Sequence, residues 1–160
     1  MWSCSFPPIL VRKPVYDVVV VGGGPAGSIA ALMLARSGAR VALVDKTVFA
    51  RHEACGDLVG PRALALLSEL GLVPPIGHQV GERIVLGPTG RRVVLPARVG
   101  RTYPDHGLAV PRLRFDAWLH DLAVEAGAEP VTARVIGLPR PVVGRARRWP
   151  AARCRAGDRR

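Results

Sequence analysis

Apolar residues change their spacing along the first third of the chain, and each spacing predicts a different element. Residues 16–21 are apolar almost without interruption and include four consecutive valines, as expected of a parallel strand buried on both faces. Good helix formers occupy residues 29–36, and a second apolar run follows at 41–44 and ends at Asp45. The order strand, helix, strand predicts a Rossmann-like βαβ unit.

Three glycines lie between the first strand and the helix with the spacing GxGxxG: Gly22, Gly24 and Gly27. Gly22 allows a tight turn, Gly24 lets a backbone approach a pyrophosphate, and Gly27 lets the helix pack against the strand. Pro25 suits the first helical turn, and Ala26 follows it within the same loop. We therefore expect the N-terminus of this helix to bind a diphosphate.

Asp45 ends the second strand, 18 residues after Gly27. Its carboxylate can accept hydrogen bonds from the hydroxyls of an adenosine ribose. It also disfavours a 2′-phosphate, because like charges 4 Å apart repel by about 4 kcal/mol at an effective dielectric of 20. FAD or NAD is thus favoured over NADP, although the adjacent Lys46 weakens that argument. The plainer interpretation is a glycine-rich turn in an ordinary α/β protein.

The pattern beyond residue 46 predicts two more helices, a β-hairpin and one more strand. Helices are expected at 61–70 and 112–126, hairpin strands at 83–86 and 91–95 around a turn at 87–90, and a strand at 129–136. The residues expected to face the core are Leu64, Leu67 and Leu70 of the first helix, and Leu113, Trp118, Leu119 and Leu122 of the second.

The net charge of +11 first suggests a nucleic-acid partner, but residues 137–160 alone hold eight arginines against one aspartate. This tail has no helix or strand period, so its few large apolar residues cannot offset the entropy cost of ordering it. We predict a disordered leader at 1–14, an incomplete nucleotide-binding domain at 15–136, and a disordered tail at 137–160. The tail is interpreted as an out-of-frame or truncated ending; a tether to nucleic acid or an acidic membrane is the alternative, and a nucleic-acid partner is disfavoured.

Three cysteines form no CxxC pair, and no Cys/His group has zinc spacing, so neither a disulfide framework nor a metal site is expected. No apolar run reaches the 18 residues or so that a membrane-spanning helix needs. These observations predict a cytoplasmic protein.

Three stretches resemble one flavoprotein family. The form DVVVVGGGPAG (17–27) resembles the FAD-binding start of the flavoproteins that include aromatic hydroxylases and halogenases. RHEACGDLVGPRALALLSELGL (51–72) and VPRLRFDAWLHDLAVEAGAE (110–129) resemble the geranylgeranyl reductase branch. The likeness covers about residues 15–136, and Asp45 replaces the more usual glutamate.

The resemblance implies FAD as cofactor and adds contacts to those expected at the glycine motif, Asp45 and Lys46. Arg51 would lie near the FAD diphosphate or adenosine, and Arg112 would contact FAD at the start of its helix. Cys55, Gly56 and Asp57 would lie near the flavin ring, and Cys55 and Asp57 are the candidates for a catalytic residue that stays unassigned.

Each of these residues also has a plainer interpretation. Cys55 would be a small buried apolar residue, since no His or Lys nearby is expected to lower its pKa. Asp57 would be a helix cap or a turn residue. Arg112 would be a surface arginine that pairs with Asp116 four residues on.

The function implied is that of an FAD-dependent oxidoreductase which reduces a C=C bond of a prenyl lipid or of an isoprenoid quinone such as menaquinone. The electron donor, a nicotinamide nucleotide or another, stays open, as does peripheral attachment to the inner face of the membrane. The alternatives are a monooxygenase or halogenase of the same superfamily, and an inactive remnant that lacks the substrate pocket.

Overall fold

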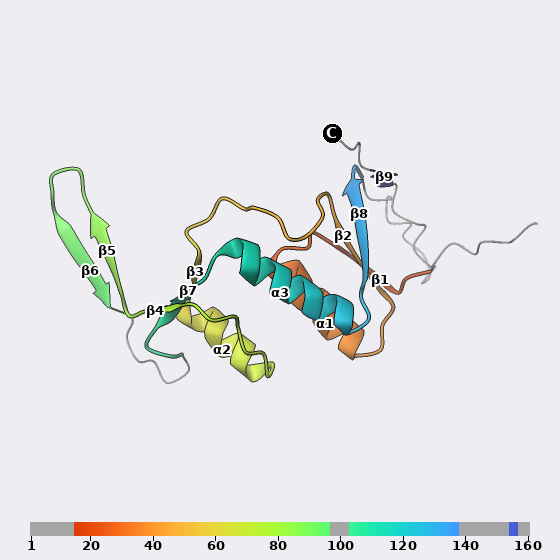
Figure 1. Ribbon diagram of the computed structural model, residues 1–160, viewed down its shortest axis with the longest axis horizontal. Coiled ribbons are helices and arrows are strands. Elements are labelled where there is room, and N and C mark those ends of the chain that lie inside the picture. The colour runs from red at the N-terminus through yellow and green to blue at the C-terminus, as the bar shows by residue number, and fades with distance from the viewer. Residues whose placement is uncertain (1–14, 97–102, 138–153, 157–160) are drawn as a thin grey trace, which may run out of the picture.

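The computed structural model describes residues 15–96, 103–137 and 154–156 (Figure 1). The leader and most of the tail therefore lie outside the described residues. In chain order the elements are β1 (Val18–Val21), α1 (Pro25–Arg36), β2 (Val41–Asp45), β3 (Leu58–Val59), α2 (Pro61–Glu69), β4 (His78–Val80), β5 (Glu82–Leu86), β6 (Arg92–Pro96), β7 (Gly107–Ala109), α3 (Arg112–Glu125), β8 (Glu129–Val135) and β9 (Cys154–Ala156).

The main sheet has the strand order β1-β2-β8-β9, and β1, β2 and β8 run parallel. Val18 pairs with Val41, and Ala42 pairs with Glu129. Helix α1 connects β1 to β2, while α3 leads into β8, and the two helices lie side by side (Figure 1). The predicted α/β fold with a Rossmann-like βαβ unit is confirmed.

The largest core lies between this sheet and the helices. Leu32 of α1, Leu43 of β2 and Leu119 of α3 are each 1% exposed and belong to one cluster. A smaller cluster on the other face of the sheet contains Ala42, Val44 and Ala133, with Tyr16 packed against it. Strand β2 is thus buried on both faces.

Strand β1 does not match the predicted burial on both faces. Its residues alternate between half-buried and exposed, and both Val19 and Val21 are exposed. The reason is position: β1 is the edge strand of the sheet, and it pairs only with β2 among the described strands. A continuous apolar run was therefore not enough to predict burial on both faces.

The face that α3 presents to the core also differs from the expectation. Its buried residues are Phe115, Asp116, Leu119 and Ala123. Of the four residues predicted, Leu119 is buried and Trp118 and Leu122 pack against the cluster from its margin, but Leu113 is not part of it. Among the described helices, none combines the length and apolarity needed to cross a bilayer.

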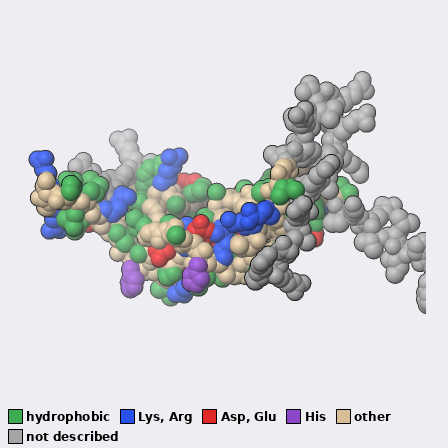
Figure 2. Space-filling view, turned by 90° about the horizontal axis from the view of Figure 1, so that it is seen from above, with side chains coloured by type: hydrophobic (Ala, Val, Ile, Leu, Met, Phe, Trp, Pro, Cys, Tyr) green, Lys and Arg blue, Asp and Glu red, His purple; other side chains and the backbone are tan. Residues whose placement is uncertain are grey.

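Two smaller sheets lie beside the main one. Strands β3, β7 and β4 form an antiparallel sheet next to α2, and β5 and β6 form the predicted hairpin, which projects away from the other elements (Figure 1). Figure 2 shows hydrophobic side chains on the surface of this hairpin, at the left end of the view. The exposed residues are Ile84, Val85, Leu86, Val93, Val94 and Leu95.

Strand β9 lies in the segment predicted to be a disordered tail. Its three residues pair antiparallel with β8, with Ala156 opposite Ala133. Beside β8 the sheet offers unpaired backbone groups, and any extended segment can satisfy them whatever its side chains. The pattern of apolar residues therefore carried no sign of this strand.

Candidate functional site

The turn between β1 and α1 has the geometry that only glycine allows. Gly22 has a φ of +101°, and its N–H donates to the carbonyl of Val44 across 2.7 Å. A Cβ added to Gly27 would lie 1.7 Å from the carbonyl oxygen of Gly22. The turn and the close helix–strand packing expected of these two glycines are therefore both present.

The N-terminus of α1 has the charge distribution of an anion site. Gly24 is the N-cap and Pro25 the first helical residue, and no acidic side chain lies in the first turn. The positive end of the helix dipole is therefore not neutralised by the helix's own residues. A Cβ on Gly24 would meet only the Arg51 Nη2 atom, at 3.6 Å, so the backbone here can be approached closely.

Ser28, which the sequence analysis did not single out, holds the turn in place. It is completely buried, and its hydroxyl donates to the carbonyl of Gly23 across 2.8 Å. The available signal was its position, as a polar side chain directly after Gly27 and before an apolar run at 29–35.

Asp45 lies against the glycine turn because β1 and β2 are parallel neighbours. Its Oδ2 accepts from the N–H of Gly23 at 2.7 Å, and its Oδ1 accepts from the N–H and hydroxyl of Thr47 at 3.0 and 2.8 Å. Burial alone would raise the pKa of Asp45, but the hydrogen bonds from Gly23 and Thr47 and the charge of Arg51 lower it below its usual value. The carboxylate is therefore ionised at neutral pH, while the adjacent Lys46 is exposed.

Arg51 and Phe49 lie over the same turn. The Arg51 Nη2 atom is 3.9 Å from the Asp45 Oδ2 atom, and Arg51 Nη1 forms an ion pair with Glu53. The Phe49 ring packs so closely on Gly23 that a Cβ there would lie 2.8 Å from a ring carbon. Phe49 was not predicted, because nothing in its local pattern separates it from an ordinary apolar loop residue.

A second group of predicted residues meets at the start of α3. The side chain of Arg112 donates two hydrogen bonds to the carboxylate of Asp116, at 2.6 and 2.7 Å. These bonds raise the pKa of Arg112. Asp116 is completely buried. The interpretation of Arg112 as a surface arginine paired with Asp116 is therefore right about the partner, but the carboxylate of the pair is buried.

Asp57 and Cys55 complete this second group. Asp57 has a φ of 51°, and its Oδ1 accepts from the backbone N–H of Arg112 at 3.0 Å, so its interpretation as a helix cap holds. Cys55 is exposed, so its interpretation as a buried apolar residue is wrong. A hydrogen bond from Arg112 is the main cause that lowers the pKa of the Cys55 thiol, an effect the sequence analysis did not foresee. Gly56 has open space around its α-carbon.

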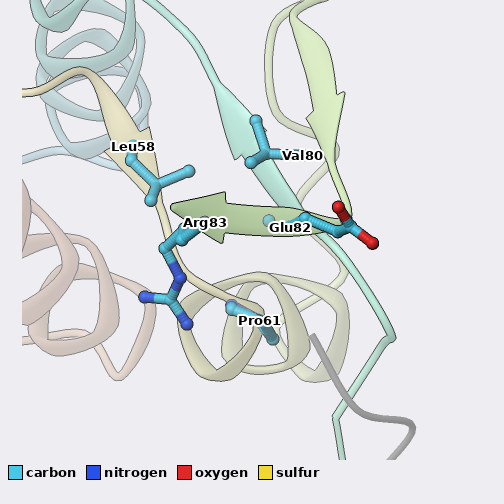
Figure 3. A pocket seen from close by; sticks show the side chains of 7 residues that line it. Leu58, Pro61, Val80, Glu82 and Arg83 are labelled. Atoms are coloured by element: carbon cyan, nitrogen blue, oxygen red, sulfur yellow. The ribbon is translucent and has the colours of Figure 1, made fainter. Parts of the chain in front are cut away.

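The structure thus divides the predicted residues between two places. The glycine motif, Asp45 and Arg51 meet at the C-terminal ends of β1 and β2, and Cys55, Asp57 and Arg112 meet at the start of α3. Within the described part of the chain, no group of three or more His, Cys, Asp or Glu side chains is arranged to hold a metal ion. A small hollow at the base of the hairpin, lined in part by Leu58, Pro61, Val80, Glu82 and Arg83, contains none of the predicted site residues (Figure 3).

The chain is similar to known flavoproteins. The family described as FAD binding domain matches residues 15–134. A menaquinone reductase of Mycobacterium tuberculosis is 40% identical over 113 residues, which are 70% of this chain and 28% of that protein. A geranylgeranyl diphosphate reductase of Rhodobacter capsulatus is 36% identical over 126 residues, 78% of this chain and 30% of that protein.

Solved structures agree. A geranylgeranyl bacteriochlorophyll reductase-like protein from Thermoplasma acidophilum superposes with a TM-score of 0.64 at 28% identity, over 79% of this chain and 32% of that one. A flavin-dependent halogenase gives a TM-score of 0.64 at 26% identity, over 80% and 24% of the two chains. The chain therefore spans about a third or less of each of these proteins.

The predicted resemblance is confirmed by both kinds of comparison. The match at residues 15–134 covers the glycine turn, Asp45, and the whole of the group around Arg112. The chain belongs to the FAD-binding domain family, among relatives of the geranylgeranyl and menaquinone reductases, and the cofactor of this fold is FAD.

Proposed function

We propose that this chain is the FAD-binding part of a reductase that saturates a C=C bond in a prenyl chain. One observation carries the proposal: a helix N-terminus without acidic residues, an ionised Asp45 and the Arg51 guanidinium all meet at one glycine turn. Anion-binding groups beside the Asp45 carboxylate suit a ligand with a diphosphate next to a sugar.

The described residues fit that ligand. The diphosphate would lie against the backbone at Gly24 to Gly27, where a side chain would obstruct it, with Arg51 beside it. Each carboxylate oxygen has about two acceptor positions, and Thr47 uses both of those on Oδ1. Asp45 can therefore accept one ribose hydroxyl at Oδ2, beside the N–H of Gly23. Phe49 covers the neighbouring Gly23 and leaves the Gly24 side open.

The group at the start of α3 would face the flavin end. FAD, when bound, would supply the hydride-transfer chemistry of the reaction. Arg112, anchored by Asp116, would place a fixed positive charge there, and Cys55 and Asp57 remain the candidates for residues next to the ring. Asp57 holds the loop to α3 whether or not it also acts on the substrate.

We infer the substrate class from the names of the relatives. Their names specify menaquinone, geranylgeranyl diphosphate and digeranylgeranylglycerophospholipid, which share an isoprenoid chain. We propose a prenyl lipid or isoprenoid quinone as substrate, with a nicotinamide nucleotide or another reductant as donor. The proposed location is the cytoplasm, with contact to the inner membrane face where a lipid substrate would be met.

Titration of the 160-residue chain with FAD tests the binding part of this proposal. We expect quenching of flavin fluorescence and a bound-flavin absorbance spectrum. Asp45→Ala should weaken FAD binding about tenfold or more, because it removes charge-assisted hydrogen bonds to the ribose. Glu69→Gln, which changes an exposed carboxylate of α2, is the matched control and should leave binding unchanged. Equal affinities of the Asp45→Ala variant and the control would contradict the proposed site.

Turnover is tested in one of the longer proteins that this chain resembles. The same Asp45→Ala change in a full-length relative, at the corresponding aspartate or glutamate, should reduce both flavin content and prenyl reduction. Loss of reduction with full flavin content would contradict the role proposed for the carboxylate.

A further inference from the structure

Three side chains form a layered cluster next to the glycine turn. The rings of Phe49 and His120 are stacked, with centroids 4.3 Å apart and planes inclined by 10°. The guanidinium carbon of Arg51 lies 5.2 Å from the centroid of the Phe49 ring. Phe49 and Arg51 belong to the loop after β2, whereas His120 belongs to α3, so the cluster joins segments about seventy residues apart in sequence.

The Arg51 guanidinium of this cluster is directed toward the glycine turn. Its Nη2 atom lies 3.9 Å from the Asp45 Oδ2 atom and would touch a Cβ on Gly24 at 3.6 Å. Its Nη1 atom pairs with Glu53, and its Nε atom is buried without a hydrogen-bond partner. A guanidinium prefers to lie against an aromatic face, and the Phe49 ring provides one here.

His120 forms the other half of the stack with Phe49. Its side chain is 14% exposed, its Nδ1 atom is buried without a hydrogen-bond partner, and the nearest carboxylate oxygen, of Asp121, is 3.7 Å away. The flat face of the imidazole contacts Phe49. An aliphatic residue would fill similar space but would not offer a flat surface to the ring.

We propose that the His120–Phe49 stack is a positioning device that fixes Arg51 against the glycine turn, so that α3 takes part in binding the diphosphate of FAD. An arginine side chain loses much rotamer freedom when it binds a ligand, and a preformed position removes that loss from the binding step. His120 and Phe49 are positioning residues that act through Arg51. The inference rests on the proposed function, in which Arg51 contacts the diphosphate.

A double-mutant cycle on FAD affinity tests this inference in the 160-residue chain. Arg51→Gln should weaken FAD binding about 10–100-fold, as expected for a lost charge-assisted hydrogen bond. Phe49→Leu and His120→Leu should each weaken it by several fold. In the Arg51→Gln background, the same two changes should have less than a twofold effect, because the residue they position is absent.

A conservative variant and a spectroscopic readout separate positioning from a general loss of structure. His120→Phe keeps the flat face and should bind FAD like the wild type. In the ligand-free chain, the NMR resonance of the Arg51 Nε–H group should be shielded by the Phe49 ring in the wild type and in His120→Phe. That shielding should be lost in Phe49→Leu and in His120→Leu, while circular dichroism stays native.

Independent effects of Phe49→Leu and Arg51→Gln would overturn the inference and leave the proposed function intact. Equal losses in His120→Phe and His120→Leu would overturn it as well. A wild-type chain that folds but leaves FAD fluorescence unchanged would instead contradict the proposed function, and the inference would fail with it.

Discussion

Strands β2 and β5 have similar apolar residues and opposite surroundings. β2 reads VALVD, and its first four residues are at most 3% exposed, whereas β5 reads ERIVL and all five of its residues are exposed. Strand β2 lies between β1 and β8 and packs against α1 and α3. Strand β5 pairs only with β6 among the described strands. An apolar run therefore predicts a strand, but the elements that cover it decide its contribution to stability.

Breaking the buried ion pair of α3 should give the largest difference in stability between the covered core and the exposed hairpin. Asp116→Asn leaves Arg112 without its anion inside a covered site and should lower the free energy of unfolding by about 3 kcal/mol. Glu82→Gln makes the same chemical change in the exposed hairpin, where surface substitutions alter stability by less than about 0.5 kcal/mol. Urea unfolding followed by circular dichroism measures both. Similar losses for the two variants would contradict the contrast.

Truncating an apolar side chain should give the next largest difference in stability between the core and the hairpin. Leu43→Ala removes a side chain that is 1% exposed, and we expect it to lower the free energy of unfolding by about 2–3 kcal/mol. Val85→Ala, at a residue of β5 that is 53% exposed, should have less than about 0.5 kcal/mol of effect. Thermal unfolding of both variants tests this pair, and a Val85→Ala variant as unstable as Leu43→Ala would show that the hairpin is covered in solution.

Two glycines provide a smaller and sharper test. Gly23→Ala places a methyl group against the Phe49 ring and should lower the free energy of unfolding by about 1–3 kcal/mol, because the ring must shift. Gly81→Ala, just before the hairpin, meets no atom within 4 Å and should have little effect. Adding Phe49→Leu to Gly23→Ala should restore part of the lost stability. Failure of that suppression would mean that the strain lies in the backbone of the turn.

Alkaline pH should give the smallest effect. Burial, together with a hydrogen bond to Glu129, raises the pKa of Tyr16 to about 12, whereas an unfolded tyrosine ionises near pH 10. The unfolded chain therefore loses this proton first, and the contribution of Tyr16 to stability is complete below pH 10 and is lost as the pH rises to 12. Unfolding at several pH values between 9 and 12 should show a decline in stability that is smaller in Tyr16→Phe. An identical decline in both proteins would assign it to other groups.

The sequence alone predicted those parts of the fold whose signals are local. The helix bounds, the hairpin and the strand–turn–helix–strand unit follow from periodicity and from glycine positions within short windows. Strands β3, β4 and β7 have only two or three residues each and form through pairing with distant segments, as Leu58 does with Ala109. Such pairing leaves no pattern in a short window.

The same limit applies to the site. Gly22, Gly27 and Asp45 were found because their spacing is fixed by one βαβ unit. The stack of Phe49 on His120 and the hydrogen bond from the Arg112 N–H to Asp57 depend on how α3 packs, so these contacts became visible only in three dimensions.

Helix α3 touches both groups of site residues, and this gives it the role of a spacer. Its first residue, Arg112, is tied to Asp57 and Cys55, and eight residues further on His120 lies against Phe49. At about 1.5 Å per residue the two attachment points are about 12 Å apart along the axis. Deleting a single residue between them would shorten this distance and rotate His120 by about 100° relative to Arg112. Under the proposed function, the length of α3 would therefore set the spacing between the groups that contact the two ends of FAD.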